Sequence, residues 1–411
     1  MQSTYTEKDF ILAYRAKQSD HRVIGLMSGT SLDGVDAVLV NIKTDIHAEI
    51  ENIQLVEHYY LPYTDAIREK VAKLCRLDSA RIDDLVYVHF GLSEWYAQAV
   101  LSLIKKAGCS AEEIDAICMH GQTVWHAPIP QDFPGPSGPI PVKGTLQLGS
   151  SAVVRERTGI PVVSDLRSAD MAAGGEGAPL APFTDFQLFG SPNEGRIIQN
   201  IGGIGNATVL PMRVGKAGVF AFDTGPGNMV MDAVVEIGTK GIHRYDPEGS
   251  IAEKGTVAEE LVTLLMQDAY FQRTPPKSTG REVYGKNFTK DFLTLASSRG
   301  LSFEDSVATA TAFTAESITR SYKDFVLPHF SIAKVLVCGG GALNPTLLHM
   351  IQQRLPEGIE VTTTNSYGVP DQAREAMAFA VMGHESLMGR PGNLPAVTGA
   401  KRPVVLGVVT L

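Results

Sequence analysis

Three glycine-rich turns, each preceded by an apolar run, constrain this chain more than any other feature. They are residues 27–36 (MSGTSLDGVD), 222–228 (FDTGPGN) and 337–344 (VCGGGALN). Glycine lacks the Cβ that keeps a backbone away from a ligand, and it permits left-handed dihedrals that direct several N–H groups at one anion. The pattern therefore indicates a phosphate site assembled from distant segments.

None of the three turns fits a single-loop nucleotide fold. No Lys-Ser/Thr pair follows a four-residue gap as in a P-loop, and none has the Rossmann glycine spacing with a later ribose-binding acid. We therefore expect two turns to hold phosphates and the third to hold the nucleoside, in a chain of two lobes around a cleft. The alternative for each turn is an ordinary tight turn built from common turn residues.

Composition and net charge limit the classes of partner that this chain is expected to bind. A chain of 411 residues exceeds the usual size of one domain, so we expect two. The net charge of −9, with no block of like charges, argues against a nucleic-acid groove or an anionic membrane and favours a small-molecule substrate. The cysteines show no paired or metal-ligand spacing, the first 22 residues carry too many charges for a signal peptide, and no segment is apolar enough to span a bilayer. We expect a cytoplasmic protein.

Two similar strand–turn–strand patterns organise the chain. Residues 23–41 and residues 196–210 each give an apolar strand, a glycine turn and a second strand. Their spacing predicts duplicated lobes, with two independent tight turns as the alternative. Later segments alternate between helical and strand patterns, which indicates an α/β fold. The expected divisions are an arm at 1–22, an N-terminal lobe at 23–195, a C-terminal lobe at 196–369, and a closing helix and tail at 370–411.

Polar residues follow two predicted strands of the first lobe. His120, Gln122 and Thr123 come after the apolar run 114–119, at the strand end where open α/β sheets bind ligands. Arg167 and Asp170 follow a second predicted strand and give either a substrate contact or a surface ion pair. Between them, residues 127–144 hold six prolines and three glycines, which predicts an irregular surface loop. Residues 277–282 resemble a phosphate loop only in composition, and we interpret them as the capped start of a helix.

An ordered set of motifs matches a known family from about residue 23 to the C-terminus. The motifs are residues 25–36 (GLMSGTSLDGVD), 120–126 (HGQTVWH), 173–179 (AGGEGAP), 200–204 (NIGGI), 223–229 (DTGPGNM), 276–282 (PKSTGRE) and 389–395 (GRPGNLP). In these the chain resembles the anhydro-N-acetylmuramic acid kinases, a branch of the sugar kinase, Hsp70 and actin superfamily that also includes the levoglucosan kinases. The resemblance implies a two-lobed, actin-like ATPase fold of the ribonuclease H-like α/β class, with the active site in the interlobe cleft.

The resemblance also implies a reaction and a set of site residues. Water opens the 1,6-anhydro bond of the sugar at C1, and the freed O6 takes the γ-phosphoryl group of ATP. Asp223 holds the family's position for the base that activates this water, and Asp33 and Glu375 are the implied anchors for Mg²⁺. The implied substrate contacts are His120, Gln122, Thr123, Arg167 and Asp170. The expected ATP contacts are Gly29, Thr30, Ser31, Leu32, Asp33, Gly34, Val35, Asp36, Gly202, Gly203, Gly225, Gly227, Asn228, Gly339, Gly340, Gly341 and Asn344.

Some assignments have a structural alternative. Asp36 alternatively fixes the hairpin, and Asn344 alternatively caps a helix. Levoglucosan is the alternative substrate, although residues 146–151 (LQLGSS) and His126 resemble the muramic acid kinases more. A more distant alternative is an actin-like switch ATPase, which usually needs a peptide-binding domain or long interface insertions that this chain lacks. The family resemblance further implies a homodimer and a role in cell-wall sugar recycling.

Overall fold

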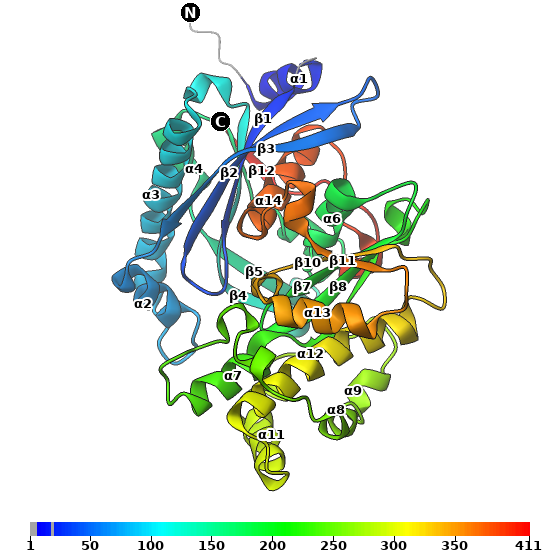
Figure 1. The fold of residues 1–411 in the computed structure, drawn as a ribbon. Coiled ribbons are helices and arrows are strands. Elements are labelled where there is room, and N and C mark those ends of the chain that lie inside the picture. The colour runs from blue at the N-terminus through cyan, green and yellow to red at the C-terminus, as the bar shows by residue number, and fades with distance from the viewer. Residues whose placement is uncertain (1–5, 18–19) are drawn as a thin grey trace, which may run out of the picture. The chain divides into compact units, whose positions relative to one another are not determined.

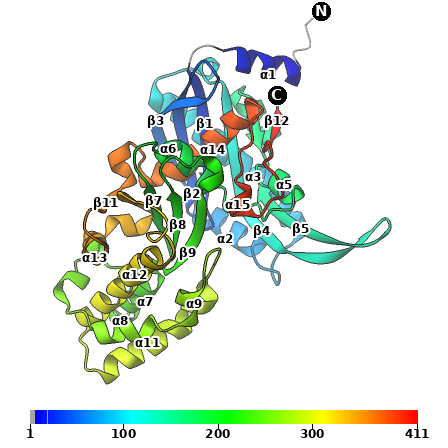
Figure 2. The same ribbon diagram turned by 90° about the vertical axis from the view of Figure 1, so that its right-hand side faces the viewer.

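The glycine hairpin expected at residues 23–41 forms two strands of a seven-stranded sheet, in a computed structural model that describes residues 6–17 and 20–411 (Figures 1 and 2). The rest of the expected N-terminal arm, residues 1–5 and 18–19, lies outside the described residues. The chain divides into a first unit, Met1–Leu188 with Gly368–Leu411, and a second unit, Phe189–Tyr367. Each unit has its own sheet, which confirms the expected two-lobed α/β class.

The sheet of the first unit combines a meander with parallel strands. Its order is β12-β6-β4-β1-β2-β3, with β5 paired to β4. The pairs β1–β2 and β2–β3 are antiparallel, whereas β4 runs parallel to both β1 and β6. The strands are β1 (His21–Ser28), β2 (Gly34–Thr44), β3 (Ile50–Pro62), β4 (Ala116–Gly135), β5 (Gly138–Leu148), β6 (Val162–Ser164) and β12 (Val408–Thr410). The helices are α1 (Glu7–Ala16), α2 (Asp65–Leu74), α3 (Ile82–Ala107), α4 (Ser151–Thr158), α5 (Ser168–Ala172), α6 (Ala181–Phe189), α14 (Asp371–Leu387) and α15 (Pro395–Thr398).

Alternation along β1 sends its side chains to two faces of the sheet. Ile24 and Leu26 join the apolar core with Leu92 of α3. The α14 helix packs on β1, β2 and β4 (Figure 1). It approaches so closely that a Cβ on Gly25 would lie 1.9 Å from the carbonyl oxygen of Ala376. Glycine at this position therefore lets the C-terminal helix dock on the strand that leads to the first turn.

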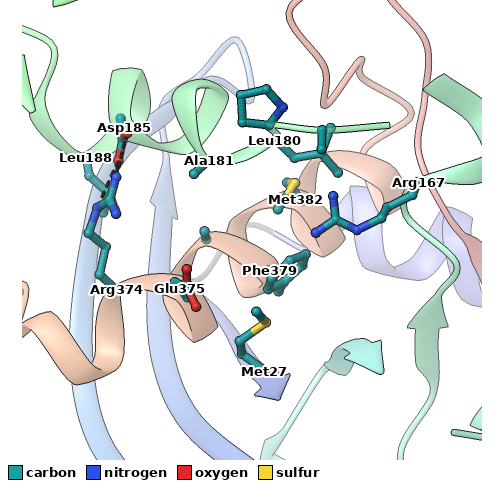
Figure 3. A pocket seen from close by; sticks show the side chains of 13 residues that line it. Met27, Arg167, Leu180, Ala181, Asp185, Leu188, Arg374, Glu375, Phe379 and Met382 are labelled. Carbon is teal, nitrogen blue, oxygen red and sulfur yellow. Dashed lines mark hydrogen bonds and ion pairs between the residues drawn. The ribbon is translucent and has the colours of Figure 1, made fainter. Parts of the chain in front are cut away.

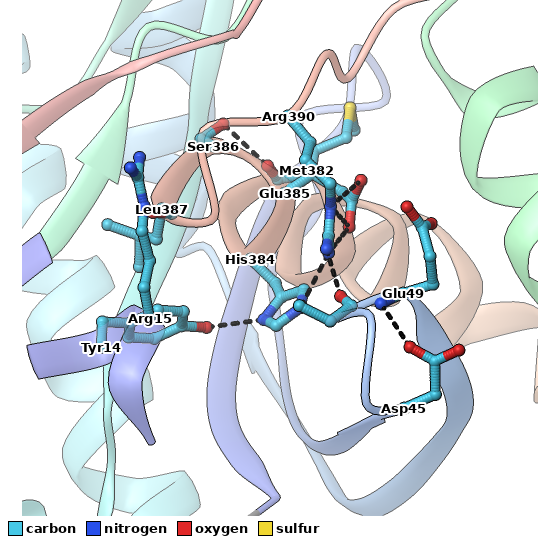
Figure 4. Close-up of polar contacts among 11 residues, drawn as sticks. Tyr14, Arg15, Asp45, Glu49, Met382, His384, Glu385, Ser386, Leu387 and Arg390 are labelled. Carbon is cyan, nitrogen blue, oxygen red and sulfur yellow. Dashed lines mark hydrogen bonds and ion pairs between the residues drawn. The ribbon is translucent and has the colours of Figure 1, made fainter. Parts of the chain in front are cut away.

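Helix α1 is fastened to α14. It starts with a capping box between Thr6 and Asp9. The hydroxyl of Tyr14 lies 2.8 Å from Nδ1 of His384, and Nε of Arg15 donates to the carbonyl of Leu387 at 2.7 Å (Figure 4). The described part of the expected arm is thus a docked helix.

The proline-rich segment is a β-hairpin, so the expected irregular loop at 127–144 is wrong. Strand β4 continues past His120 to Gly135 and pairs with β5, with Gln131 opposite Val142 and Pro134 opposite Pro139. Prolines are tolerated because each strand of a two-stranded ribbon has an open edge, where a missing N–H breaks no ladder bond. The same continuation means that β4 does not end at residue 119. Strands β3 and β12 were not expected from the sequence.

The second sheet repeats the first. Its order is β11-β10-β7-β8-β9, with an antiparallel β7–β8–β9 meander and parallel β7–β10 and β10–β11 pairs. This matches β6-β4-β1-β2-β3 strand for strand, and the segment between the third and fourth strands of each unit includes a long helix, α3 or α12. The topology supports duplicated lobes. The strands are β7 (Arg196–Ile201), β8 (Ile204–Leu210), β9 (Phe220–Pro226), β10 (Lys334–Cys338) and β11 (Glu360–Thr363).

The helices of the second unit surround a single apolar core. Phe222 of β9 and Ile197 of β7 belong to it, together with Phe313 and Ile318 of the long helix α12. The helices are α7 (Asn228–Gly238), α8 (Glu259–Leu265), α9 (Ala269–Gln272), α10 (Arg281–Tyr284), α11 (Lys286–Ser298), α12 (Phe303–Phe325) and α13 (Pro345–Arg354). None of the helices within 6–17 and 20–411 is long and apolar enough to cross a membrane.

Candidate active site

The turn between β1 and β2 exposes backbone donors. Thr30 and Ser31 lie at the surface, and the turn is closed by a hydrogen bond from the N–H of Leu32 to the carbonyl of Gly29 at 3.3 Å. Leu32 has a φ of 57°, a conformation that costs a non-glycine residue about 1–3 kcal/mol. Within the described part of the chain, the amides of Thr30 and Ser31 donate to no protein acceptor. Both are therefore available to an anion.

Buried polar groups hold this turn in place. Gln122 is fully buried, and its Nε2 donates to the carbonyl of Gly29 at 3.0 Å. The hydroxyls of Ser28 and Tyr96 lie 2.5 Å apart. Thr123 accepts from Nε2 of Gln147 at 3.2 Å and is partly exposed. Gln122 thus shapes the turn, and its Oε1 has no hydrogen-bond partner among the described residues.

The remaining predicted residues of this hairpin lie in β2. Gly34 and Val35 are both buried, and Val35 belongs to the apolar core. Asp36 accepts from Nε2 of His58 on β3 at 2.8 Å. This contact gives Asp36 a structural role, although it ties β2 to β3 and not to β1.

Arg167 and His120 form a directional pair in the first unit. The Nε–H of Arg167 donates to Nε2 of His120 at 2.9 Å, and Nη1 donates to the carbonyl of Gly177 at 2.6 Å. Because arginine only donates, His120 carries its proton on Nδ1. Burial and the charge of Arg167 lower the pKa of His120 to about 3, so the ring is neutral. Its buried Nδ1 has no hydrogen-bond partner among residues 6–17 and 20–411.

Asp170 has a structural role in the first unit. It is fully buried, and its Oδ1 accepts from Asn393 at 2.6 Å and from Thr398 at 2.7 Å. Its Oδ2 accepts from the N–H of Gly177 at 2.8 Å. Neither the expected substrate contact nor the alternative surface ion pair with Arg167 fits a carboxylate that is enclosed by three protein donors. Asp170 instead ties the loop at Gly177 to the segment around α15.

A cavity of about 230 Å³ lies beside Arg167 in the first unit (Figure 3). Its apolar lining consists of Met27, Ala178, Pro179, Leu180, Ala181, Leu188, Ala378, Phe379 and Met382. Arg167 and Glu375 supply polar groups to its wall, where Arg374 also forms a bidentate ion pair with Asp185 at 2.6 and 2.7 Å. A mostly apolar cavity with a few placed polar groups is the usual form of a small-molecule site.

Negative charge gathers near this cavity. Glu375 lies early in α14, and its side chain is exposed on the cavity wall, while Asp33 is exposed in the first turn. The protein atoms packed around the carboxylate raise the pKa of Glu375. The positive charge of Arg374 opposes this shift, and the negative charges of Asp36 and Asp33 add to it. A cation would relieve this repulsion. In the described ranges, no three His, Cys, Asp or Glu side chains form a metal cluster, but Mg²⁺ commonly uses only one or two carboxylates beside phosphate oxygens and water.

Glycine segments converge in the second unit. The N–H groups of Gly227 and Asn228 donate to the carbonyls of Gly203 and Gly202 at 2.9 and 2.7 Å. Nδ2 of Asn228 donates to the carbonyl of Ile201 at 3.3 Å. A Cβ on Gly341 would lie 3.2 Å from Oδ1 of Asn228. The structure thus brings together the β7–β8 turn, the start of α7 and the third glycine-rich turn.

The second glycine-rich turn differs from expectation. Strand β9 continues through Asp223 to Pro226, and the amides at the start of α7 are already bonded to the β7–β8 turn. Gly225 has a φ of 139°, and a Cβ there would lie 2.9 Å from the ring of Phe271. A Cβ on Gly227 would lie 2.2 Å from the carbonyl oxygen of Gly202. Close packing inside the protein accounts for both glycines without a phosphate contact.

The third glycine-rich turn leads into α13. Gly339 has a φ of 79°, and a Cβ there would lie 2.5 Å from Oδ1 of Asn200, whereas Gly340 is exposed. Oδ1 of Asn344 accepts from the N–H of Leu347 at 2.9 Å, which confirms that Asn344 caps a helix. The exposed backbone at Gly340 is the part of this turn that is open to a ligand.

Asp223 is the best-supported reactive group of the second unit. Its Oδ2 accepts from the N–H of Thr279 at 2.9 Å, while Oδ1 accepts no hydrogen bond from the described residues. Burial raises the pKa of Asp223, and the N–H of Thr279 and the charge of Lys277 partly oppose the shift. A carboxylate with one oxygen fixed, one open and a raised pKa suits a general base.

Residues 277–282, which contact Asp223, differ from the sequence-based interpretation. A helix does start within residues 277–282, because α10 begins at Arg281, but its N-cap is Gly280 and no side chain caps it, so the expected capping is wrong. The segment instead contacts Asp223 through the carbonyl of Lys277 and the N–H of Thr279. A lysine and a threonine after two prolines gave no local signal of this contact, because the partner strand lies about fifty residues earlier in the chain.

Comparison with known proteins gives one consistent family. A family model described as anhydro-N-acetylmuramic acid kinase matches residues 21–411. Similar curated proteins of that description come from Caldanaerobacter subterraneus, with 44% identity over 96% of this chain and 98% of the relative, and from Salinibacter ruber, with 41% identity over 98% and 99%. A third, from Clostridioides difficile, is 40% identical over 94% of this chain and 97% of the relative.

Proposed function

Because the chain belongs to the anhydro-N-acetylmuramic acid kinase family, we propose that it uses ATP to convert 1,6-anhydro-N-acetylmuramic acid into N-acetylmuramic acid 6-phosphate and ADP. Water adds to C1, the C1–O6 bond of the anhydro bridge breaks, and O6 takes the γ-phosphoryl group. The arrangement at Asp223 is the observation that carries this proposal. The reaction belongs to the recycling of cell-wall sugar.

Asp223 acts as the general base. Its open Oδ1 takes a proton from the attacking water, while the N–H of Thr279 fixes Oδ2 and hence the direction of the carboxylate. The raised pKa of Asp223 makes it a stronger base than an exposed aspartate. A placed base typically contributes about 10²- to 10⁴-fold to the rate.

Ring opening and phosphoryl transfer assist each other. The negative charge that develops on O6 as the C1–O6 bond breaks is taken up by phosphorus, so no free alkoxide has to exist. Phosphoryl transfer depends mainly on positioning and charge neutralisation. The free amides of Thr30 and Ser31 supply fixed donors to phosphate oxygens, and the exposed backbone at Gly340 contacts the nucleoside.

Mg²⁺ is part of the proposal, with Asp33 and Glu375 as its protein anchors. When bound, the ion supplies charge neutralisation to the triphosphate. The mutual repulsion among Asp33, Asp36 and Glu375 supports this assignment. Both anchors lie in the first unit, one in the β1–β2 turn and one on α14.

The cavity beside Arg167 favours the muramic substrate over levoglucosan. Anhydro-N-acetylmuramic acid carries N-acetyl and lactyl groups, which bring methyl groups and a carboxylate, whereas levoglucosan has only hydroxyl groups. The apolar lining suits the methyl groups, and the guanidinium of Arg167 suits a carboxylate. His120 supplies its buried Nδ1–H to a sugar oxygen.

Two further parts of the proposal rest on family resemblance. The protein acts in the cytoplasm, where ATP is available, and it assembles as a homodimer. Light scattering after size-exclusion chromatography tests the second part, because a mass of a single 44.2 kDa chain at working concentrations would contradict it.

The base assignment is tested by Asp223→Asn, because an amide cannot accept the proton of water. We expect D223N to lower kcat about 10²- to 10⁴-fold while calorimetry still detects ATP binding. D291N, at an exposed position on α11, is the matched control and should leave kcat unchanged. If D223N turns over at the wild-type rate, the assignment fails.

A further inference from the structure

Lys277 is a buried cation without a hydrogen-bonded anion. Its side chain is only 8% exposed, and Nζ has no hydrogen-bond partner in the described part of the chain. The ammonium group lies 4.8 Å from the ring centroid of Tyr270 and 4.6 Å from that of Phe325. Cation–π contacts of this kind offset only part of the cost of removing an unpaired charge from water. The fold therefore keeps a costly charge at this position, and packing alone does not account for it.

Lys277 and Asp223 share neighbouring residues. The N–H of Asp223 donates to the carbonyl of Lys277 at 3.0 Å, and the N–H of Thr279 donates to Oδ2 of Asp223. Tyr270, which supports the ammonium group, donates its hydroxyl to the carbonyl of Asp223 at 2.7 Å. One short segment and one aromatic ring thus hold both the cation and the carboxylate, although no direct ion pair joins them among the described residues.

We propose that Lys277 is a positioning residue for Asp223: its ammonium group favours the ionised carboxylate that proton abstraction needs, and its backbone fixes the strand that carries it. The inference rests on the proposed role of Asp223 as the base. It assigns a task to a residue that contacts neither the sugar nor the phosphates in the proposed reaction. Removing the charge should therefore change the pH at which the enzyme works, and the loss of activity should depend on pH.

The charges around Lys277 and Asp223 support the proposal that Lys277 favours the ionised form of Asp223. Burial raises the pKa of Asp223, and Lys277 lowers it. Burial lowers the pKa of Lys277 to about 8, and the negative charges of Asp324 on α12 and of Asp223 oppose this shift. Further titratable or charged neighbours lie on or beside α9: Tyr270, whose pKa is raised by burial and by Asp223, and Arg273, which opposes that shift. With a pKa of about 8, Lys277 is mostly protonated near neutral pH and carries the positive charge that the proposal requires.

The test replaces Lys277 with a residue of similar length and no charge. In Lys277→Met, the acidic limb of the kcat/KM profile should move to higher pH by about one unit, because the ionised carboxylate loses a neighbouring positive charge. At a fixed pH on the acidic side of the profile, kcat/KM of the variant should be about tenfold lower than that of the wild type. The pH-independent plateau of kcat/KM should change much less. Lys277→Arg should restore the wild-type limb. Lys290→Met, at an exposed position on α11, should leave the profile unchanged.

A titration that does not depend on activity separates this inference from the proposed function. In protein labelled with ¹³C at aspartate carboxyl groups, the signal lost in D223N identifies Asp223. We expect its midpoint to rise in K277M and to stay at the wild-type value in K277R. If K277M does not fold, K277Q serves as the second charge-removing variant. An unchanged midpoint and acidic limb in the charge-free variant would overturn the role of Lys277, whereas an active D223N would overturn the base assignment.

Discussion

At the scale of single residues, Arg167 joins three features of the first unit. Its guanidinium group donates to His120 and to the carbonyl of Gly177, and it also reaches the wall of the apolar cavity (Figure 3). These contacts fix a planar group in one direction, as recognition of a carboxylate requires. We therefore propose that Arg167 recognises the lactyl carboxylate.

Arg167→Met should weaken sugar binding while sparing nucleotide binding. Loss of a charged hydrogen bond costs about 1.5–3 kcal/mol, so we expect KM for the anhydro sugar to rise about 10- to 100-fold. Steady-state kinetics at saturating ATP measure this, with Arg157→Met, which removes an exposed ion pair with Glu94 on the same unit, as the control. An unchanged KM for the sugar, or an equal rise in KM for ATP, would contradict the assignment.

The role of a residue was predictable from the sequence where its partners lie nearby in the chain. The cap at Asn344 was foreseen as an alternative, because a helix cap depends on neighbouring residues. A structural role for Asp36 was also foreseen as an alternative, but its partner His58 on β3 was not. The role of Asp170 was not foreseen, since its partners Asn393 and Thr398 come from the far end of the chain. The environment of Lys277 was hidden in part for the same reason: Phe325 lies far along the chain at the end of α12, although Tyr270 on α9 is close in sequence.

At the scale of elements, the docking of α14 on β1 depends on a missing side chain. Gly25→Ala would place a Cβ within 1.9 Å of the carbonyl oxygen of Ala376, so the helix or the strand would have to move. Overpacking of this kind costs about 1–3 kcal/mol or more. Because Glu375 precedes Ala376 on the same helix, the shift should also disturb the proposed metal anchor.

Chemical unfolding measures this effect. We expect a lower free energy of unfolding in G25A and a higher Mg²⁺ requirement for activity. Gly91→Ala is the matched control, because a Cβ at that exposed position on α3 would have no atom within 4 Å apart from its chain neighbours and the backbone of its own helix. It should stabilise the helix by about 0.5–1 kcal/mol. If G25A were as stable as G91A, the account of this contact would be wrong.

Elements were predictable where periodicity is strong and local. The alternation of helices and strands expected in the later part of the chain is present, with β10, α13, β11 and α14 in that order. The β4–β5 hairpin was hidden by its prolines, which usually mark loops but are compatible with the open edges of a ribbon. Strand β12 has only three residues and is stabilised by pairing with β6, which a local pattern cannot reveal.

At the scale of the whole molecule, the residues proposed for the reaction are distributed over two units whose sheets have the same strand order. The first unit carries the turn with free amides, the cavity beside Arg167 and the carboxylates proposed for Mg²⁺. The second unit carries Asp223, Lys277 and the glycine segment proposed for the nucleoside. This repeat was foreseen from two strand–turn–strand patterns, because each unit begins with the same meander. The long return of the chain from Gly368 to the first unit was not expected as part of that unit.

The central claim is that the chain phosphorylates an anhydro amino sugar. It is tested most directly by ADP release from purified protein with ATP and Mg²⁺, measured in parallel with anhydro-N-acetylmuramic acid, with levoglucosan and without sugar. We predict release that depends on sugar, with kcat/KM at least about tenfold higher for the muramic substrate. A preference for levoglucosan would contradict the substrate, and release that is indifferent to both sugars would contradict the kinase and favour a switch ATPase.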